Sequence, residues 1–227
     1  MSLTDNYRNV QNRVMAACEM AGRPKDDVRL IAVSKTKPVS DIREIYDAGC
    51  RDFGENKVQE ILEKYDQLPG DVRWHMIGHL QTNKVRQVID KAYMIHGVDS
   101  RKLADVISRE ACKKGITVRI LIEVNVADEE TKFGTDLNEG PDLYEYATSL
   151  PGIEVCGLMT IAPYTVDAEE NRQYFVDLKQ LSVDIINQNH HNGECMELSM
   201  GMTGDYEVAI EEGSTMVRVG TGIFGPR

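Results

Sequence analysis

Short apolar segments alternate with longer amphipathic segments along nearly the whole chain. The short segments have the length and composition of β-strands, and several, such as ILIEVNV, are too apolar to have a solvated face. Strands that are buried on both faces are typical of a parallel sheet covered by helices. Eight segments fit this description, and they read RLIAVSK, RDFGE, RWHMIG, YMIHGVD, VRILIEVNV, IEVCGLMTI, MELSMG and TMVRVGTGIF.

The segments between the predicted strands carry signals for helix starts and stops. Ser100 can cap a helix that closes with Lys113, Lys114 and Gly115, basic residues and a glycine where a helix end favours them. The other predicted starts are Ser40 ahead of Asp41, Asn56 with Gln59 as a capping box, Pro141, Asp167 with Glu170, and Thr203.

Eight strand and helix units in about 200 residues predict a closed (β/α)8 barrel, or TIM barrel. The alternative is an open doubly wound sheet, which usually has fewer strands. No linker rich in proline, glycine or serine divides the sequence, so residues 1–227 are expected to form a single domain. An extra helix is expected before the first strand, because one face of the N-terminal segment carries Tyr7, Val10, Val14, Met15 and Cys18.

Composition and charge narrow the class of protein. The formal net charge of -11 argues against nucleic acid as a partner. No stretch approaches the roughly 20 apolar residues that a membrane span requires, and the start of the sequence lacks the order of a signal peptide. We therefore expect a cytoplasmic protein without a membrane partner.

Histidine and cysteine spacing predicts no metal site. His75 and His79 are four residues apart, but no glutamate follows the first, so the HExxH motif is not present. His190 and His191 fall in a polar segment and are expected to be solvated. The cysteines form no CxxC pair and are expected to be mostly small buried side chains, at Cys18, Cys50, Cys112, Cys156 and Cys195.

Two glycine-rich segments near the C-terminus are candidate anion sites. GTGIFG, residues 220–225, has GxGxxG spacing, but too little chain follows it for the helix and acidic residue of a dinucleotide site. Its glycines still allow backbone N–H groups to approach a phosphate, after the eighth strand where barrels often bind one. LSMGMTGD, after the seventh strand, offers similar chemistry through Ser199, Gly201 and Gly204. Ordinary turns with a helix cap at Thr203 are the alternative interpretation.

Lys35, at the end of the first apolar segment, is the candidate nucleophile. In an extended strand Ile31, Val33 and Lys35 share one face, and an inward face would bring Lys35 to the C-terminal mouth of the barrel. Desolvation there lowers the pKa of an amine and prepares it to attack an aldehyde. The alternative is a solvated lysine at the rim, an interpretation that suits Lys37 next to Pro38 better.

A lysine that faces two phosphate-binding loops suits a phosphorylated aldehyde, and pyridoxal 5'-phosphate (PLP) is such a ligand. Six segments in order also resemble the pyridoxal-phosphate homeostasis proteins, which are single-domain, fold-type III relatives of alanine racemase. These segments are AVSKTKP, FGENKVQE, WHMIGHLQTNK, NVADEETKFG, GLMTI and LSMGMTGDYEVAIEEGSTMVRVGTGIFG. The resemblance implies a barrel that holds PLP as a Schiff base on Lys35. It implies a role in intracellular PLP homeostasis, by buffering or delivery, with PLP-requiring apoenzymes as candidate partners.

The resemblance also implies roles for individual residues. Arg218 of VRVG would face the pyridine nitrogen, and Asn56 of FGEN would approach the cofactor from the second strand. Lys132 of TKFG fits a family motif but receives no role, and a solvated loop residue is its alternative interpretation. The phosphate would be held by Ser199, Gly201, Gly220 and Thr221.

An arginine beside the ring nitrogen disfavours protonation there and weakens the cofactor as an electron sink. The resemblance implies that related racemases use a second domain to supply a tyrosine base, whereas this sequence ends after its eighth predicted strand. We therefore expect a monomer without robust catalysis. The alternatives are a PLP-dependent amino-acid racemase or lyase, and a barrel enzyme for phosphorylated sugars with Lys35 as its Schiff-base lysine.

Overall fold

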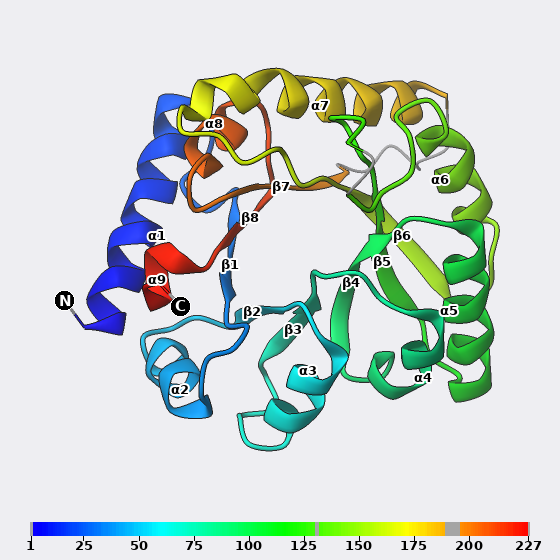
Figure 1. Ribbon diagram of the computed structural model, residues 1–227, viewed down its shortest axis with the longest axis horizontal. Helices are drawn as coiled ribbons and strands as arrows, with labels where there is room; N and C mark the ends of the chain where they lie inside the picture. The colour runs from blue at the N-terminus through cyan, green and yellow to red at the C-terminus, as the bar shows by residue number, and fades with distance from the viewer. Residues whose placement is uncertain (1, 130–131, 189–195, 227) are drawn as a thin grey trace.

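Eight parallel strands close into a barrel in chain order (Figure 1). The computed structural model describes residues 2–129, 132–188 and 196–226. Within them the last strand pairs with the first, for example through Ile31 and Arg218, which confirms the predicted (β/α)8 barrel and excludes the open sheet. The strands are β1 (Arg29–Val33), β2 (Asp52–Glu55), β3 (Arg73–Met76), β4 (Ala92–Val98), β5 (Val118–Glu123), β6 (Ile153–Met159), β7 (Glu197–Met202) and β8 (Met216–Val219).

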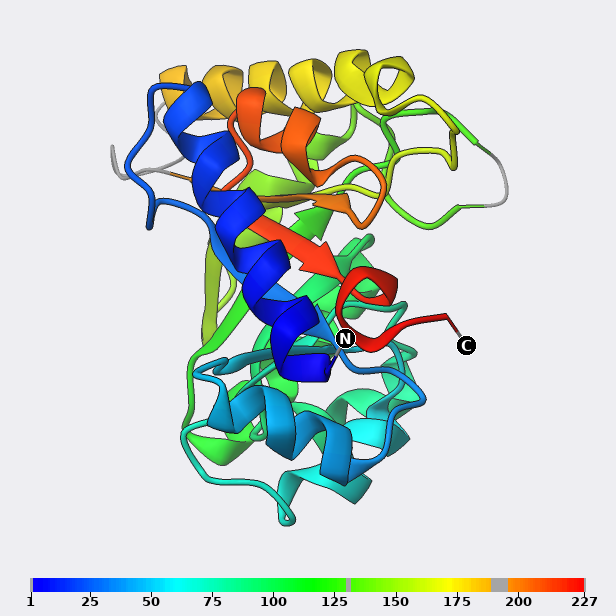
Figure 2. The ribbon, with the colours of Figure 1, turned by 90° about the vertical axis from the view of Figure 1, so that its left-hand side faces the viewer.

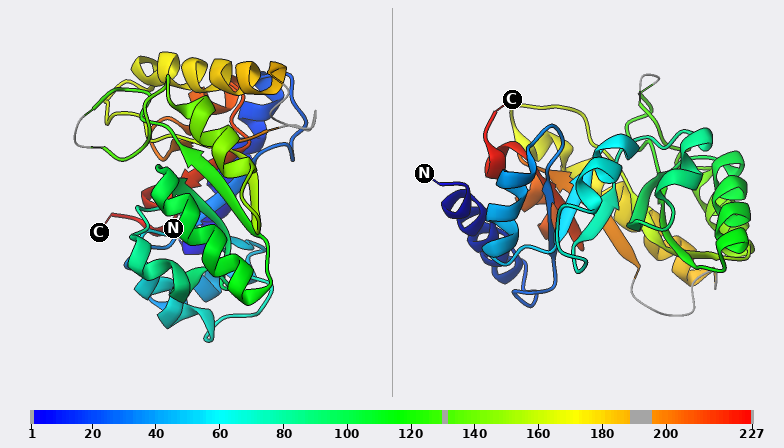
Figure 3. Two further views of the ribbon diagram at one scale, coloured as in Figure 1. Left: turned by 90° about the vertical axis from the view of Figure 1, so that its right-hand side faces the viewer. Right: turned by 90° about the horizontal axis from the view of Figure 1, so that it is seen from below.

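Helices surround the barrel and bury the outward faces of its strands. In chain order they are α1 (Leu3–Met20), α2 (Val39–Asp47), α3 (Val58–Tyr65), η1 (Thr82–Lys84), α4 (Val85–Val88), α5 (Arg101–Lys114), α6 (Gly140–Thr148), η2 (Ala168–Asn171), α7 (Arg172–Asn187), α8 (Tyr206–Glu211) and α9 (Thr221–Phe224). Figure 3 shows the flank on which α5 and α6 lie over β5 and β6. The large core between strands and helices explains why the outward-facing side chains of the strands are apolar.

Several predicted helix ends are confirmed. The Ser100 hydroxyl accepts a hydrogen bond from the backbone N–H of Leu103, and Gly115 ends α5 in the left-handed region, at a φ of 64°. Pro141 lies in the first turn of α6, and the side chain of Asp167 caps η2.

Three predicted helix starts are wrong. The N-cap of α2 is Pro38 rather than Ser40, and the N-cap of α3 is the residue after Asn56. The N-cap of α8 is Asp205, so Thr203 lies in the loop before the helix. Asn56 and Thr203 instead lie at the mouth of the barrel, where tertiary structure overrides the local capping preference.

The predicted N-terminal helix is α1, which runs along α8 and α9 on the outside of the barrel (Figure 2). The side chain of Asn6 donates a hydrogen bond to the backbone carbonyl of Ile223 at 3.1 Å. This contact fixes the short C-terminal helix next to the barrel mouth. The buried side chains of α1 largely match the predicted face and are Tyr7, Val10, Val14, Ala17 and Cys18.

The inside of the barrel has an apolar part and a polar part. The apolar side chains form their own cluster of Ile31, Met94, Leu121, Met159 and Met216. Polar and charged side chains that are buried among the strands include Asp52, His75, His96, Glu123, Ser199 and Arg218. Buried charges are costly unless they are paired or hydrogen-bonded, so this polar interior is a structural feature that requires an explanation.

Candidate functional site

A cavity of about 460 Å³ opens at the C-terminal ends of the strands. This is the face where barrel enzymes place their chemistry. The cavity has a partly apolar wall, and it brings together a lysine, an arginine, two glycine-rich loops and several hydroxyl and amide groups. It is lined by Val33, Lys35, Asn56, Ile77, Ile161, Pro163, Tyr164, Thr165, Asn171, Met202, Thr203, Gly204, Asp205, Arg218, Gly220 and Thr221.

Lys35 lies in a turn rather than on the first strand. The strand ends at Val33, and Thr36 has a φ of 64°, which is uncommon for a β-branched residue. Lys35 is half-buried and lines the cavity. The predicted position at the mouth is therefore correct, but the predicted strand geometry is wrong.

Four polar side chains hold the turn of Lys35 in place. The Lys64 ammonium donates to the carbonyl of Ser34 at 3.0 Å and to the carboxylates of Glu55 at 2.8 Å and Glu60 at 3.0 Å. Glu55 also accepts the Ser34 hydroxyl at 2.6 Å, and Glu60 accepts the backbone N–H of Thr36 at 2.6 Å. Lys64, Glu55 and Glu60 thus fix the residues on both sides of Lys35. This arrangement pre-organises the lysine.

Asn56 follows β2 directly and faces the same cavity. The backbone of Gly78 packs against it so closely that a Cβ at Gly78 would lie 2.5 Å from the Asn56 carbonyl oxygen. Only glycine allows this approach. Lys37 does not project into solvent as expected, because its ammonium donates to the carbonyl of Phe224 at 3.0 Å and ties the turn to α9.

The two glycine-rich loops meet at the cavity. Thr203 and Gly204 follow β7, Gly220 and Thr221 follow β8, and all four residues line the same space. The backbone N–H of Gly220 donates to the Thr203 hydroxyl at 3.3 Å, which joins the two loops. Hydroxyl groups and backbone N–H groups at the start of a helix are suitable donors for an anion.

Arg218 lines the cavity from inside the barrel and is only 4% exposed. Its guanidinium donates to the Ser199 hydroxyl at 2.6 Å and to the Thr160 carbonyl at 2.7 Å. Burial lowers the pKa of Arg218 to about 10, so the group is still cationic at neutral pH. A fixed positive charge therefore faces the cavity.

Ser199 and Gly201 are not among the cavity-lining residues. Ser199 is fully buried, and its hydroxyl contacts His96 and Arg218. Gly201 has a φ of 91°, and a Cβ there would lie 2.6 Å from the Cβ of Ala209 in α8. Their contact with a phosphate stays a prediction. In the structure, Ser199 contacts Arg218 and Gly201 packs against α8, both just below the cavity.

Several cavity residues were not predicted as site residues. The Asp205 carboxylate accepts hydrogen bonds from the Met202 backbone N–H at 2.6 Å and from the Asn171 side chain at 2.8 Å. Tyr164 lies at the rim and is 95% exposed. Thr203 carried a sequence signal, since it stands between two glycines, whereas Tyr164 and Asn171 have no local pattern that separates them from ordinary loop residues.

The remaining predictions concern positions outside the cavity. Lys132 donates to the carboxylate of Glu129 at 2.8 Å, which is consistent with a loop residue. His190, His191 and Cys195 lie outside the described residues. Over the part of the chain that is described, no cluster of three side chains could hold a metal ion. No helix in that same part is long and apolar enough to cross a membrane.

Comparison with known proteins identifies the class first. Residues 2–227 match the family described as alanine racemase, N-terminal domain. Alanine racemase of Clostridium difficile superposes with a TM-score of 0.77 at 14% identity, covering 98% of this chain and 57% of that one, and it shares the fold. The barrel is therefore of the alanine-racemase type.

Closer relatives define the family within this class. The pyridoxal phosphate homeostasis protein of Aquifex aeolicus is 46% identical, over 100% of this chain and 99% of its own. PipY of Synechococcus elongatus, a structure with PLP bound, is 34% identical with a TM-score of 0.82, covering 95% of this chain and all of PipY. The chain belongs to the family of pyridoxal phosphate homeostasis proteins, as its sequence motifs had indicated.

Proposed function

We propose that this protein binds PLP in the cavity at the barrel mouth and acts in the cytoplasm to buffer the cofactor or to deliver it to PLP-requiring apoenzymes. The observation that carries the proposal is the shared cavity of Lys35, Arg218 and the two glycine-rich loops. Relatives that match over the full chain are named for PLP homeostasis, and PipY has been solved with PLP bound.

The residues of the cavity fit this cofactor. PLP supplies an aldehyde that a lysine amine captures reversibly as a Schiff base, and Lys35 is the lysine at this cavity. Arg218 offers a buried positive charge for the pyridine nitrogen, and Asn56, directly after β2, would contact the cofactor. The phosphate would be held by the loop donors of Thr203, Gly204, Gly220 and Thr221, and a contact from Ser199 and Gly201 stays part of the proposal. The Ser199 hydroxyl contacts Arg218, and Gly201 packs against α8.

We also propose that catalysis is weak. The Arg218 cation disfavours a proton on the ring nitrogen, so a carbanion on the substrate gains little stabilisation. Two-base racemisation needs a second acid or base opposite the lysine. Among the described cavity residues, the Asp205 carboxylate already accepts two hydrogen bonds, and Tyr164 is too exposed to be held in one position.

PLP titration tests the binding proposal directly. Wild-type protein is expected to develop the near-ultraviolet and visible absorbance of a Schiff base on addition of PLP, and Lys35→Ala is expected to lose it. Lys102→Ala, an exposed lysine on α5, is the matched control and should behave like wild type. A wild-type protein that develops no such absorbance, or a Lys35→Ala variant that retains it, would contradict the proposal.

The racemase alternative is tested by incubating the PLP-loaded protein with a panel of L- and D-amino acids. Exchange far below about 1 per second is expected, which is slow for an enzyme. Turnover at or above that rate with any amino acid would instead favour a PLP-dependent racemase or lyase.

A further inference from the structure

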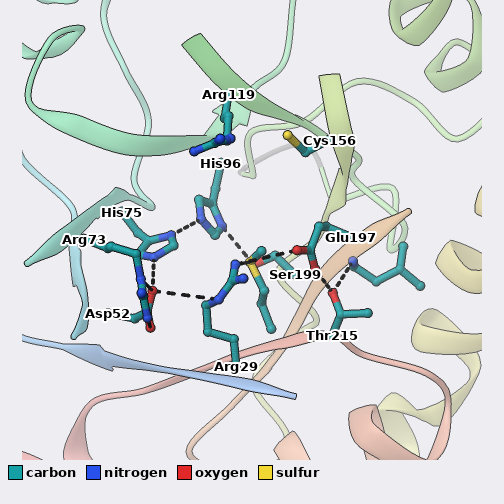
Figure 4. A network of polar contacts seen from close by, with 12 residues as sticks. Arg29, Asp52, Arg73, His75, His96, Arg119, Cys156, Glu197, Ser199 and Thr215 are labelled. Carbon is teal, nitrogen blue, oxygen red and sulfur yellow. Dashed lines mark hydrogen bonds and ion pairs between the residues drawn. The ribbon is translucent and has the colours of Figure 1, made fainter. Parts of the chain in front are cut away.

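A series of hydrogen bonds runs through the inside of the barrel, and Figure 4 shows it from Asp52 to Ser199. The Asp52 carboxylate contacts Nε2 of His75 at 2.9 Å, and Nδ1 of His75 contacts Nε2 of His96 at 2.9 Å. Nδ1 of His96 contacts the Ser199 hydroxyl at 2.9 Å, and this hydroxyl contacts Arg218 at 2.6 Å. We call these five residues the interior network. It crosses the barrel from the start of β2 to the C-terminal mouth.

The two ends of the interior network fix the direction of every hydrogen bond in it. An arginine can only donate, so the Ser199 oxygen accepts a hydrogen bond from Arg218. An ionised aspartate can only accept, so His75 carries its proton on Nε2. With one proton on each ring, His96 donates from Nε2 to Nδ1 of His75 and accepts the Ser199 hydroxyl at its own Nδ1, so His75, His96 and Ser199 each donate once and accept once.

The environment of each titratable group agrees with these protonation states. Although burial opposes it, hydrogen bonds from Arg73 and His75 lower the pKa of Asp52 to about 2, so the carboxylate is ionised. Burial lowers the pKa of His75, even though Asp52 favours its charged form, and burial lowers the pKa of His96 further, with His75 and Arg218 adding to the effect. Both imidazoles are therefore neutral at pH 7.

We propose that His96, itself hydrogen-bonded to His75 and through it to Asp52, is a positioning residue for Arg218. His96 accepts the hydrogen bond of the Ser199 hydroxyl, so that a lone pair of the Ser199 oxygen faces the guanidinium. Arg218 forms no salt bridge among the described residues and is held there by two neutral acceptors, Ser199 and the Thr160 carbonyl. If the Ser199 hydroxyl pointed its proton at Arg218, the guanidinium would face another donor in place of one of its two acceptors. For the PLP site this inference rests on the proposed function, since Arg218 is the residue expected to face the ring nitrogen.

The tautomers can be measured without any cofactor. In protein labelled with ¹⁵N histidine, both His75 and His96 are expected to be neutral, with the proton on Nε2, at neutral pH. A His75→Gln variant assigns the two sets of signals. His79, which is partly exposed and contacts Asp99 rather than a member of the interior network, serves as the reference. A proton on Nδ1 of His96, or a doubly protonated His96, would overturn the inference.

A double-mutant cycle tests whether His96 acts through Ser199 on PLP binding. His96→Leu and Ser199→Ala are each expected to weaken PLP binding about tenfold, the effect of losing one hydrogen bond to a charged group. The double variant is expected to stay within about twofold of Ser199→Ala, because the second change removes nothing further. Losses that multiply in the double variant would overturn the inference.

His96→Asn separates positioning from a general packing effect. Its amide oxygen can accept the Ser199 proton but cannot reach His75, so PLP affinity should stay within about threefold of wild type. An affinity as low as that of His96→Leu would contradict the inference. His79→Leu is the matched control and should bind PLP like wild type.

If wild-type protein binds no PLP, the proposed function fails while the tautomer measurement still stands. If wild type binds PLP but the cycle is additive, only this inference fails.

Discussion

The turn that carries Lys35 is held by charged side chains that are themselves buried. Lys64 is 6% exposed, and its ammonium makes three contacts below the turn, to Ser34, Glu55 and Glu60. All three protons of the ammonium group are used in this way. Removing one member of such a cluster leaves the others buried without compensation, which costs more than a surface ion pair would.

Lys64→Met is expected to lower the free energy of unfolding by about 3 kcal/mol, because burial already raises the pKa of Glu55 to about 7, and without its buried partner this side chain would have to take up a proton. It should also weaken PLP binding, since Ser34 and Thr36 lose their anchor. Urea unfolding measures the first effect and absorbance titration the second. Lys102→Met, on an exposed position of α5, should change stability by less than about 0.5 kcal/mol.

The double variant Glu55→Gln with Lys64→Met removes both charges and should recover part of the lost stability. Unchanged stability in Lys64→Met would show that the cluster does not hold the turn.

Glu123 is a buried carboxylate inside the barrel whose Oε2 has no hydrogen-bond partner among the described residues. Burial, with a smaller contribution from Asp99, raises the pKa of Glu123 from 4.5 to about 7. The folded protein therefore binds a proton at this site more readily than the unfolded chain. The stability that this provides is complete below pH 4.5 and is lost as the pH rises through 7.

Glu123→Gln stays neutral at every pH, so it is expected to become more stable than wild type as the pH rises. The difference in free energy of unfolding should grow by about 2 to 3 kcal/mol between pH 5 and pH 8. Urea unfolding at several pH values measures it. The exposed Glu145→Gln, on α6, should show no such trend. A constant difference between Glu123→Gln and wild type would contradict this account of Glu123.

At the scale of elements, the junction of β7 and α8 shapes the loop that faces the cavity. Gly201 has a φ of 91° and lies against Ala209 and Tyr206, so that β7 and α8 can approach closely. Met202, the last residue of β7, and Thr203 in the loop follow directly and line the cavity. A side chain at Gly201 would both strain the backbone and push α8 away.

Gly201→Ala is expected to destabilise the protein by about 2 to 4 kcal/mol, from the unfavourable φ and the clash with α8. Thermal unfolding measures the loss. Gly70→Ala is the matched control, because Gly70 lies in the loop before β3 with no atom within 4 Å of an added Cβ. Equal melting temperatures for the two variants would contradict the argument.

The elements themselves could be predicted because their signal is strong. All eight strands were found, because short apolar segments alternate regularly with longer amphipathic segments along the chain. Element ends were harder to predict. The first strand stops at Val33 because Ser34 and its neighbours turn to meet Glu55 and Lys64, which come from later parts of the sequence. Contacts of this kind cannot be read from local pattern.

At the scale of the whole molecule, the cavity could be predicted only in part. Lys35, Asn56, Arg218, Gly220 and Thr221 were predicted from the motifs and line one cavity. Ser199 and Gly201 come from the same motifs but lie below it, because β7 continues to Met202 and the loop therefore begins later than expected.

The interior network could not be predicted at all. His75 and His96 are 21 residues apart and meet only because β3 and β4 are neighbours in the barrel.

We propose that the protein is a monomer. The large apolar side chains that are exposed, Met20, Phe133, Tyr164 and Val166, are few among the described residues. A stable dimer usually buries a larger apolar patch, and the net charge of -11 adds repulsion between copies. Light scattering is expected to give a mass near the 25.5 kDa of one chain. A mass near twice that value at micromolar concentration would contradict this expectation.

The central claim is that the amine of Lys35 captures the aldehyde of PLP. The most direct test is borohydride reduction of the protein with bound PLP, followed by peptide mapping by mass spectrometry. A single major modified peptide is expected, with the pyridoxyl group on Lys35. A pyridoxyl group that is spread over surface lysines, or that is fixed on another lysine such as Lys37, would contradict it.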